Sequence, residues 1–179
     1  MALNPIGNFE TGHQELRHKA CTLCPFADIS SPMPDLEPDF WRKKALADMS
    51  RDEWEALCDG CAKCCLHRLE DEETREIYFT NVHCRLLNLE NGQCTDYTHR
   101  STLVPDCVTL TPAELEDPYW LPSTCAYRLL AEGKELPEWH PLVSGDPDSV
   151  VRSGNTILGR CICEDDADDL AQHIITWMR

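Results

Sequence analysis

The chain has 179 residues, which is enough for one domain with a hydrophobic core, and we expect a single folded unit. It carries 32 acidic against 16 basic side chains, giving a formal net charge of -16, and no basic run longer than Arg42-Lys43-Lys44. Such a surface repels phosphate backbones, so nucleic acid is not expected as a partner.

The chain contains twelve cysteines, and the cellular compartment decides what they can do. Residues 1–12 have neither a basic nor an apolar segment of the kind found in secretory signals. No later stretch approaches the ~18 apolar residues that a membrane span needs. We therefore expect a cytoplasmic chain without a membrane partner, in which metal ligation is favoured over disulfides.

Residues 1–38 are predicted to form a flexible arm because Gly, Asn and Pro are frequent there, and residues 39–179 to form the cysteine-rich domain. Cys21 and Cys24 make a C-x2-C pair inside the arm. This pair is compatible with half of a zinc site, with a redox pair or with an incidental spacing.

Two helices are predicted before the main cysteine cluster. The first begins near Pro38, with Phe40 and Trp41 on its apolar face. The second follows Ser50–Glu53, which fits an S-x-x-E capping box, and it runs directly into Cys58. The end of a short helix is thus expected to position the first thiol.

Four cysteines then occur within eight residues, in the array C-x2-C-x2-C-C formed by Cys58, Cys61, Cys64 and Cys65. Thiolates are soft ligands that select zinc, copper(I) and iron–sulfur clusters. Gly60 supplies a tight turn between the first two cysteines, which suits a metal-binding loop. Core burial alone does not account for this spacing.

Further cysteines follow in segments of mixed structure. A strand is predicted over residues 76–82, and Asn91-Gly92 predicts a hairpin turn flanked by Cys84 and Cys94. Cys107 lies in a proline-bent loop. A capping box at 111–114 starts a short helix, and a longer helix over 124–132 presents Cys125 from its first turn.

The C-terminal region is predicted to contain a strand over residues 156–163 and an amphipathic helix over 167–178. Cys161 and Cys163 fall on this strand and are left outside the main site, because a pair of small core residues explains them equally well. These elements together predict a small α+β domain with short helices and a small antiparallel sheet or hairpin.

Eight cysteines between residues 58 and 125 are enough for two tetrahedral sets. Adjacent side chains usually point in different directions, so Cys64 and Cys65 are expected to serve two sites or one cluster. In the alternative, a [4Fe–4S] cluster uses the C-x2-C-x2-C triplet and is completed by a distant thiol such as Cys125. Cys84 and Cys94 also fit ordinary buried thiols.

The histidines are weaker candidates for ligation. His67 and His83 lie close in sequence to cysteines and could replace a thiolate, whereas His99 and His140 have no such neighbour. For each of them a surface position or a role inside the core is favoured.

The array, together with EIYFTNV at 76–82, TCAYRLLAEGK at 124–134 and WHPL at 139–142, resembles the YcgN-like bacterial proteins. These carry the CxxCxxCC domain, which is named for zinc or iron chelation, and the similarity covers about residues 39–157. The resemblance implies metal chelation by Cys58, Cys61, Cys64 and Cys65, with Cys84, Cys94, Cys107 and Cys125 in matching segments. It implies no particular reaction.

The expected function is therefore that of a cytoplasmic protein that binds zinc, or iron including an iron–sulfur cluster, as its cofactor. No catalytic residue is predicted. One alternative is a redox or iron–sulfur enzyme with an open metal position, and another is an acidic, zinc-stabilised adaptor that binds a second protein. The metal ion is the partner common to all three.

Overall fold

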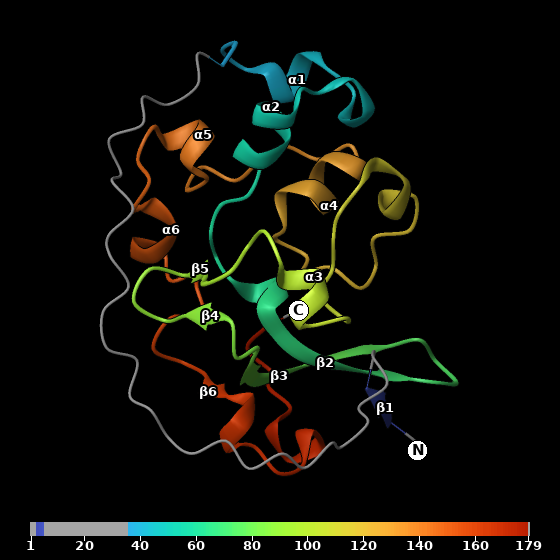
Figure 1. Ribbon diagram of the computed structural model, residues 1–179. Helices are drawn as coiled ribbons and strands as arrows, with labels where there is room; N and C mark the ends of the chain where they lie inside the picture. Colours follow the sequence, from blue (N-terminus) through green and yellow to red (C-terminus); the bar gives the residue numbers. More distant parts are fainter. Residues whose placement is uncertain (1–2, 6–35, 179) are drawn as a thin grey trace.

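The computed structural model describes residues 3–5 and 36–178, where short helices lie mainly to one side of a small sheet (Figure 1). This confirms the predicted α+β class. The predicted arm over 1–38 lies mostly outside the described residues, and so do Cys21 and Cys24. No helix in the described ranges is long and apolar enough to cross a lipid bilayer.

The helices are α1 (Phe40–Lys43), α2 (Arg51–Ala56), α3 (Arg100–Leu103), α4 (Ala126–Ala131), α5 (Pro141–Ser144) and α6 (Ser149–Arg152). The strands are β1 (Leu3–Pro5), β2 (Leu66–Asp71), β3 (Ile77–His83), β4 (Leu87–Asn88), β5 (Gln93–Cys94) and β6 (Ile162–Cys163). Turns of 3-10 helix occur at Leu46–Asp48, Lys63–Cys65, Pro112–Leu115, Glu164–Asp166 and Leu170–His173.

The larger sheet has the strand order β1-β2-β3-β6. Its first three strands pair antiparallel, whereas β6 joins β3 in parallel, with Val82 opposite Ile162. The predicted hairpin also forms: β4 and β5 pair antiparallel, and Gly92 adopts a φ of 71° in the connection. Most side chains avoid this conformation, which explains the glycine.

The helical segment predicted from Pro38 is divided into two pieces. α1 ends at Lys43 because Lys44 and Ala45 are extended, and a 3-10 turn follows at Leu46–Asp48. The predicted capping box is confirmed: the Ser50 hydroxyl accepts from the backbone N–H of Glu53, and the Glu53 carboxylate accepts from that of Ser50. α2 therefore begins where the sequence predicts.

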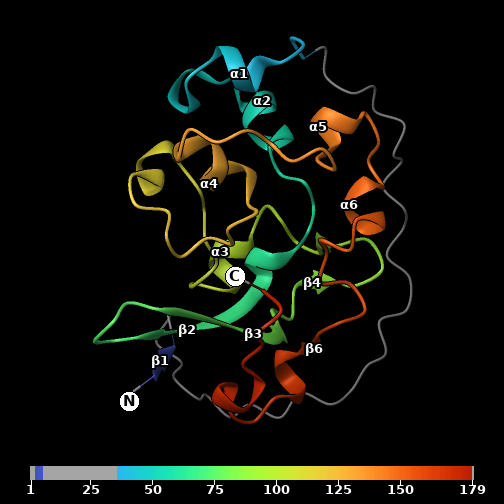
Figure 2. The same cartoon turned by 180° about the vertical axis from the view of Figure 1, so that it is seen from behind.

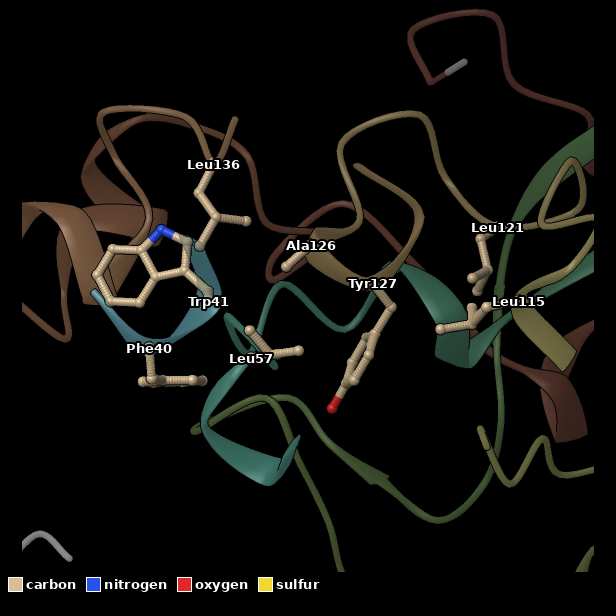
Figure 3. Packing of buried hydrophobic residues seen from close by; sticks show 8 residues of the cluster. All are labelled: Phe40, Trp41, Leu57, Leu115, Leu121, Ala126, Tyr127 and Leu136. Atoms are coloured by element: carbon tan, nitrogen blue, oxygen red, sulfur yellow. The ribbon is translucent and has the colours of Figure 1, made fainter. Parts of the chain in front are cut away.

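Two separate clusters of buried side chains form the core. The helical core, shown in Figure 3, consists of Phe40, Trp41, Leu57, Leu115, Leu121, Ala126, Tyr127 and Leu136. The sheet core consists of Ala62, Leu66, Phe79, Leu87, Ile157 and Met178. Because Leu57 belongs to one cluster and Leu66 to the other, the cysteine array between them is anchored at both ends.

The C-terminal region departs from its predicted elements. Only Ile162–Cys163 is a strand, because Thr156 and Ile157 turn inward and the Ile157 amide donates to the Cys61 carbonyl at 3.2 Å. The predicted helix over 167–178 is wrong. After the 3-10 turn at Leu170–His173, the β-branched run from Ile174 extends along β3, where the Ile175 amide donates to the Phe79 carbonyl.

Glu164 fastens this C-terminal region to the sheet. One carboxylate oxygen lies 2.5 Å from His67 Nε2, and the other accepts from the backbone and guanidinium of Arg85 at 3.1 and 3.0 Å. Burial favours a higher pKa for Glu164, but these hydrogen bonds outweigh it and lower the pKa to about 2.

Replacement of Glu164 with Gln is expected to lower the free energy of unfolding by about 2 kcal/mol at neutral pH. A carboxylate with a lowered pKa stabilises the fold above its ordinary value of 4.5, and this contribution disappears as the pH falls toward 2. Urea unfolding at pH 7 and at pH 3.5 should therefore show a smaller difference between the variant and the wild type in acid. The exposed Glu116, changed to Gln, is the control; a loss of stability that does not depend on pH would contradict this account.

Candidate metal centre

The array forms where α2 ends, in a series of tight turns. The backbone bends at Gly60 and Ala62, which have φ values of 70° and 60°, and then enters the 3-10 turn Lys63–Cys65. Asp59 stabilises the first bend, because its Oδ1 accepts a hydrogen bond from the Cys61 amide at 3.0 Å. In Figures 1 and 2 this segment connects the helices around α2 with the start of β2.

Four thiols, from Cys58, Cys61, Cys64 and Cys125, form what we term the first thiol set. Surrounding protein atoms raise the pKa of Cys58 to about 12, with the charge of Cys64 adding to the effect, although the residue is exposed to solvent. Burial likewise raises the pKa of Cys125 to about 11, and Cys64 again contributes. Burial and the charges of Asp59 and Cys64 raise the pKa of Cys61. These four groups are thus electrostatic neighbours.

Cys125 reaches this set through a contact between distant segments. It is the N-cap of α4, one residue before the predicted first turn, and it packs against the helical core. The ammonium of the buried Lys63 donates to the hydroxyl of Thr124 at 2.8 Å. This bond joins the array to the segment that carries Cys125.

The second thiol set contains Cys65, Cys84, Cys94 and Cys107. The Cys84 amide donates to the Cys65 carbonyl at 2.9 Å, and Cys94 lies opposite Leu87 in the hairpin. Burial raises the pKa of Cys107, and the charge of Cys94 adds to this rise. Cys107 also acts on Cys84 and Cys65, so it links the hairpin with the array.

Cys64 and Cys65 lie where the two sets meet. A hydrogen bond between their thiols lowers the pKa of Cys64 and raises that of Cys65. The adjacent side chains are therefore in contact rather than turned fully apart. Beyond this contact, Cys64 interacts with Cys58, Cys61 and Cys125, whereas Cys65 interacts with Cys84 and Cys107. Cys64 also acts on Cys107, so the two sets are adjacent to each other at this junction.

Three histidines near the array have other hydrogen-bonding partners. His67 pairs with Glu164, and His83 lies with Nδ1 2.8 Å from the Cys84 carbonyl. His140 is fully buried: its Nδ1 accepts from the Leu142 amide, so Nε2 carries the proton and donates to the Leu57 carbonyl, each at 3.1 Å. The expected core role is confirmed for His140.

The remaining described cysteines, Cys161 and Cys163, lie half-buried at β6. Cys161 packs against the sheet core, and its thiol donates to the Ile157 carbonyl at 3.4 Å. A role in packing is sufficient to account for it.

The thiols of the two sets are candidate metal ligands, but they do not form a coordination shell in this structure. Over residues 3–5 and 36–178, no three His, Cys, Asp or Glu side chains are placed so that they could hold a metal ion. The donor chemistry nevertheless fits a soft or borderline cation, because the two sets together contain eight free thiols. Closure of a shell would require the thiols to move closer together.

The sequence analysis did not predict three polar residues that lie at the array. Asp59 Oδ2 is buried without a hydrogen-bond partner, and so is Nε of Arg68, whose guanidinium stacks on Trp120 at 4.8 Å. The positive charge of Arg68 also favours the thiolate of Cys64. Lys63 is the third, and like Asp59 it lies inside the C-x2-C-x2-C-C run, which is the only sequence signal that could have pointed to it.

Comparison with known proteins agrees with this location of the site. A family model matches residues 57–126, from the end of α2 to the start of α4, under the description "CxxCxxCC: Putative zinc- or iron-chelating domain". This segment contains all eight cysteines of the two sets. No solved structure matches the chain significantly.

Relatives match over most of both chains. A UPF0260 protein of Rhizorhabdus wittichii is 60% identical over 136 residues, which are 76% of this chain and 93% of that protein. One from Parvibaculum lavamentivorans is 57% identical over 147 residues, or 81% and 96% of the two chains. One from Granulibacter bethesdensis is 53% identical, covering 77% and 83%. With this identity over most of its length and with the CxxCxxCC segment at its centre, the chain belongs to the UPF0260 family.

Proposed function

We propose that the protein binds zinc or iron through eight cysteines, as two centres that correspond to the first and second thiol sets. The observation that carries this proposal is the division of the thiols at Cys64 and Cys65. Three of the four interactions of Cys64 with cysteines other than Cys65 are with the first set and one is with Cys107, whereas those of Cys65 are with Cys84 and Cys107. Counted with Cys64 and Cys65 themselves, and with Cys94 beside Cys107, each set contains four thiols. Four thiolates satisfy one tetrahedral zinc ion or one cubane cluster.

The protonation of the thiols supports a role for a cation. Desolvation by the surrounding protein atoms raises the pKa of Cys58, Cys61 and Cys125, so these groups are neutral thiols at pH 7 when nothing is bound. A metal ion displaces such protons, and its binding free energy then contributes to folding. Each cysteine turns about one side-chain torsion among three staggered positions, so rotation of the thiols can bring them closer without a change of fold.

Nearby cations reduce the charge that such centres accumulate. Four thiolates around one divalent ion carry a net charge of -2, in a chain that is already acidic. Lys63 and Arg68 both lie at the array, and their side chains are inside the protein or stacked against it. They favour thiolate ligands in the same way that opposite charges lower a carboxyl pKa.

Metal analysis with an absorption spectrum, on protein purified without oxygen, tests the proposal. About two zinc ions per colourless chain would support two zinc centres, and brown protein that contains iron with inorganic sulfide would support clusters. A chain that retains neither metal after it has been exposed to both, while remaining folded by circular dichroism, would contradict metal binding.

We also propose a reducing, cytoplasmic location. All ten cysteines in the described residues are free, including the contacting pair Cys64 and Cys65. Reduced thiols are typical of the cytoplasm, where a metal rather than a disulfide holds them together.

A further inference from the structure

Asp59 is a buried carboxylate with one oxygen unaccounted for. Only 9% of the residue is exposed. Its Oδ1 accepts a hydrogen bond from the Cys61 amide, whereas Oδ2 is enclosed by protein and has no hydrogen-bond partner of normal geometry. The Cys61 thiol also interacts with this carboxylate while it keeps its proton, an interaction that is lost when the thiol becomes a thiolate ligand. Burial of a charged oxygen without a partner is costly, so its persistence calls for a positive group or a donor at that point.

The surroundings of Asp59 make this oxygen more unusual. Its negative charge acts on Cys58, Cys61, Cys64 and Cys125, which are the four members of the first thiol set. A carboxylate among thiols disfavours every thiolate there, and thus opposes the state that binds metal, unless a cation lies between them. The Lys63 ammonium donates instead to Thr124, so it does not occupy Oδ2.

We propose that Asp59 is a fifth ligand of the metal centre at the first thiol set, binding the ion through Oδ2, so that this centre is five-coordinate rather than tetrahedral. This inference rests on the proposed function. The bond from the Cys61 amide to Oδ1 orients the carboxylate, as hydrogen bonds from surrounding groups do for ligating carboxylates generally. The buried orphan oxygen and the four thiols around it are thereby explained by one cation.

An oxygen ligand gives the first centre a preference for different metal ions from those that the second centre prefers. Zinc and iron(II) accept both oxygen and sulfur, whereas copper(I) is selected by soft thiolate and thioether ligands. No carboxylate with an orphan oxygen accompanies the second thiol set among the described residues. We therefore expect the first centre to bind a borderline divalent ion through mixed ligands and the second centre to be purely thiolate.

Replacement of Asp59 with Asn tests the assignment with little change of shape, since the amide oxygen can still accept from the Cys61 amide. Asp71→Asn is the matched control: Asp71 is also buried and its Oδ1 accepts from the backbone amides of Glu73 and Thr74, but it lies at the β2–β3 turn. The full chain is titrated anaerobically with Co²⁺, and affinity is then measured by competition with zinc.

A ligand role predicts that Asp59→Asn shifts the ligand-field bands of one Co²⁺ equivalent and lowers the affinity for that equivalent by about tenfold or more. Asp71→Asn should leave both equivalents unchanged. Wild-type bands for both equivalents in Asp59→Asn would overturn the assignment while leaving the proposed function intact. A wild-type chain that takes up no Co²⁺ or zinc would instead refute the proposed function.

Circular dichroism establishes whether Asp59→Asn is folded. If it is not, Asp59→Ser provides the same test, because its hydroxyl can still accept from the Cys61 amide while the carboxylate is removed. Altered bands for one equivalent would then support ligation, and unaltered bands for both would overturn it.

Discussion

Serine in place of Cys61 is expected to remove about half of the bound metal and to leave the other half in place. Cys61 is a buried member of the first thiol set, and the largest interactions that raise its pKa come from burial, Asp59 and Cys64. Loss of one thiolate opens one coordination shell and leaves a separate shell closed. Metal content per folded chain, measured after gel filtration, gives the result.

The reciprocal variant is Cys107→Ser, which should remove the metal of the second set and retain that of the first. Cys161→Ser is the control for loss of a half-buried thiol outside both sets, and it should retain all of the metal. If Cys61→Ser and Cys107→Ser each lose all metal, the eight thiols hold one joint cluster instead of two centres.

Cys65→Ser tests whether Cys65 only contacts Cys64 or is a ligand that the two metal centres share. Its thiol is hydrogen-bonded to Cys64, but its other thiol neighbours belong to the second set. Two independent centres predict loss of the second metal only. Loss of both would show that Cys65 bridges or couples the centres.

His140→Ala is expected to lower the free energy of unfolding by about 3 kcal/mol at pH 7.5. The imidazole is fully buried and satisfies the Leu57 carbonyl and the Leu142 amide, so its removal leaves a cavity and two buried groups without partners. Urea unfolding of matched preparations provides the measurement. Because Leu57 immediately precedes Cys58, the variant also tests whether this anchor supports the array.

The stability that His140 provides should also depend on pH. Burial lowers the pKa of His140, so the unfolded chain takes up a proton near its ordinary value of 6.5 while the folded chain remains neutral. The contribution of His140 to stability is therefore complete above pH 6.5 and declines as the pH falls below it. This part of the dependence of the unfolding free energy on pH should be missing in His140→Ala. His99→Ala, at an exposed histidine, should change stability by no more than ~0.5 kcal/mol. An equal slope in wild type and His140→Ala would contradict this origin of the pH dependence.

Local signals in the sequence predicted several elements because their determinants lie within a few residues. The Ser50–Glu53 capping box, the positive φ of Gly60 and Gly92, and the placement of Cys125 at the start of α4 follow from short-range hydrogen bonding and backbone sterics. The apolar pattern of residues 167–178 was misleading, because helical and extended periods are hard to separate when Ile174 and Ile175 are β-branched. Here pairing with the backbone of β3 decided the outcome, because Ile174 lies opposite Thr80 and the Ile175 amide donates to the Phe79 carbonyl.

The sequence by itself identified cysteine thiols as the candidate functional groups of this protein. The spacing of Cys58, Cys61, Cys64 and Cys65 was sufficient to predict metal binding. Only the tertiary structure decided which thiols are neighbours. The grouping of the thiols into two sets depends on long-range contacts, such as the hydrogen bond between Lys63 and Thr124, two residues that are 61 positions apart in the sequence. It also decided the environment of Asp59: a residue that sequence places in a turn becomes a buried carboxylate among four thiols once two cores enclose both ends of the array. Burial and long-range packing are properties of the folded chain, and no spacing rule contains them.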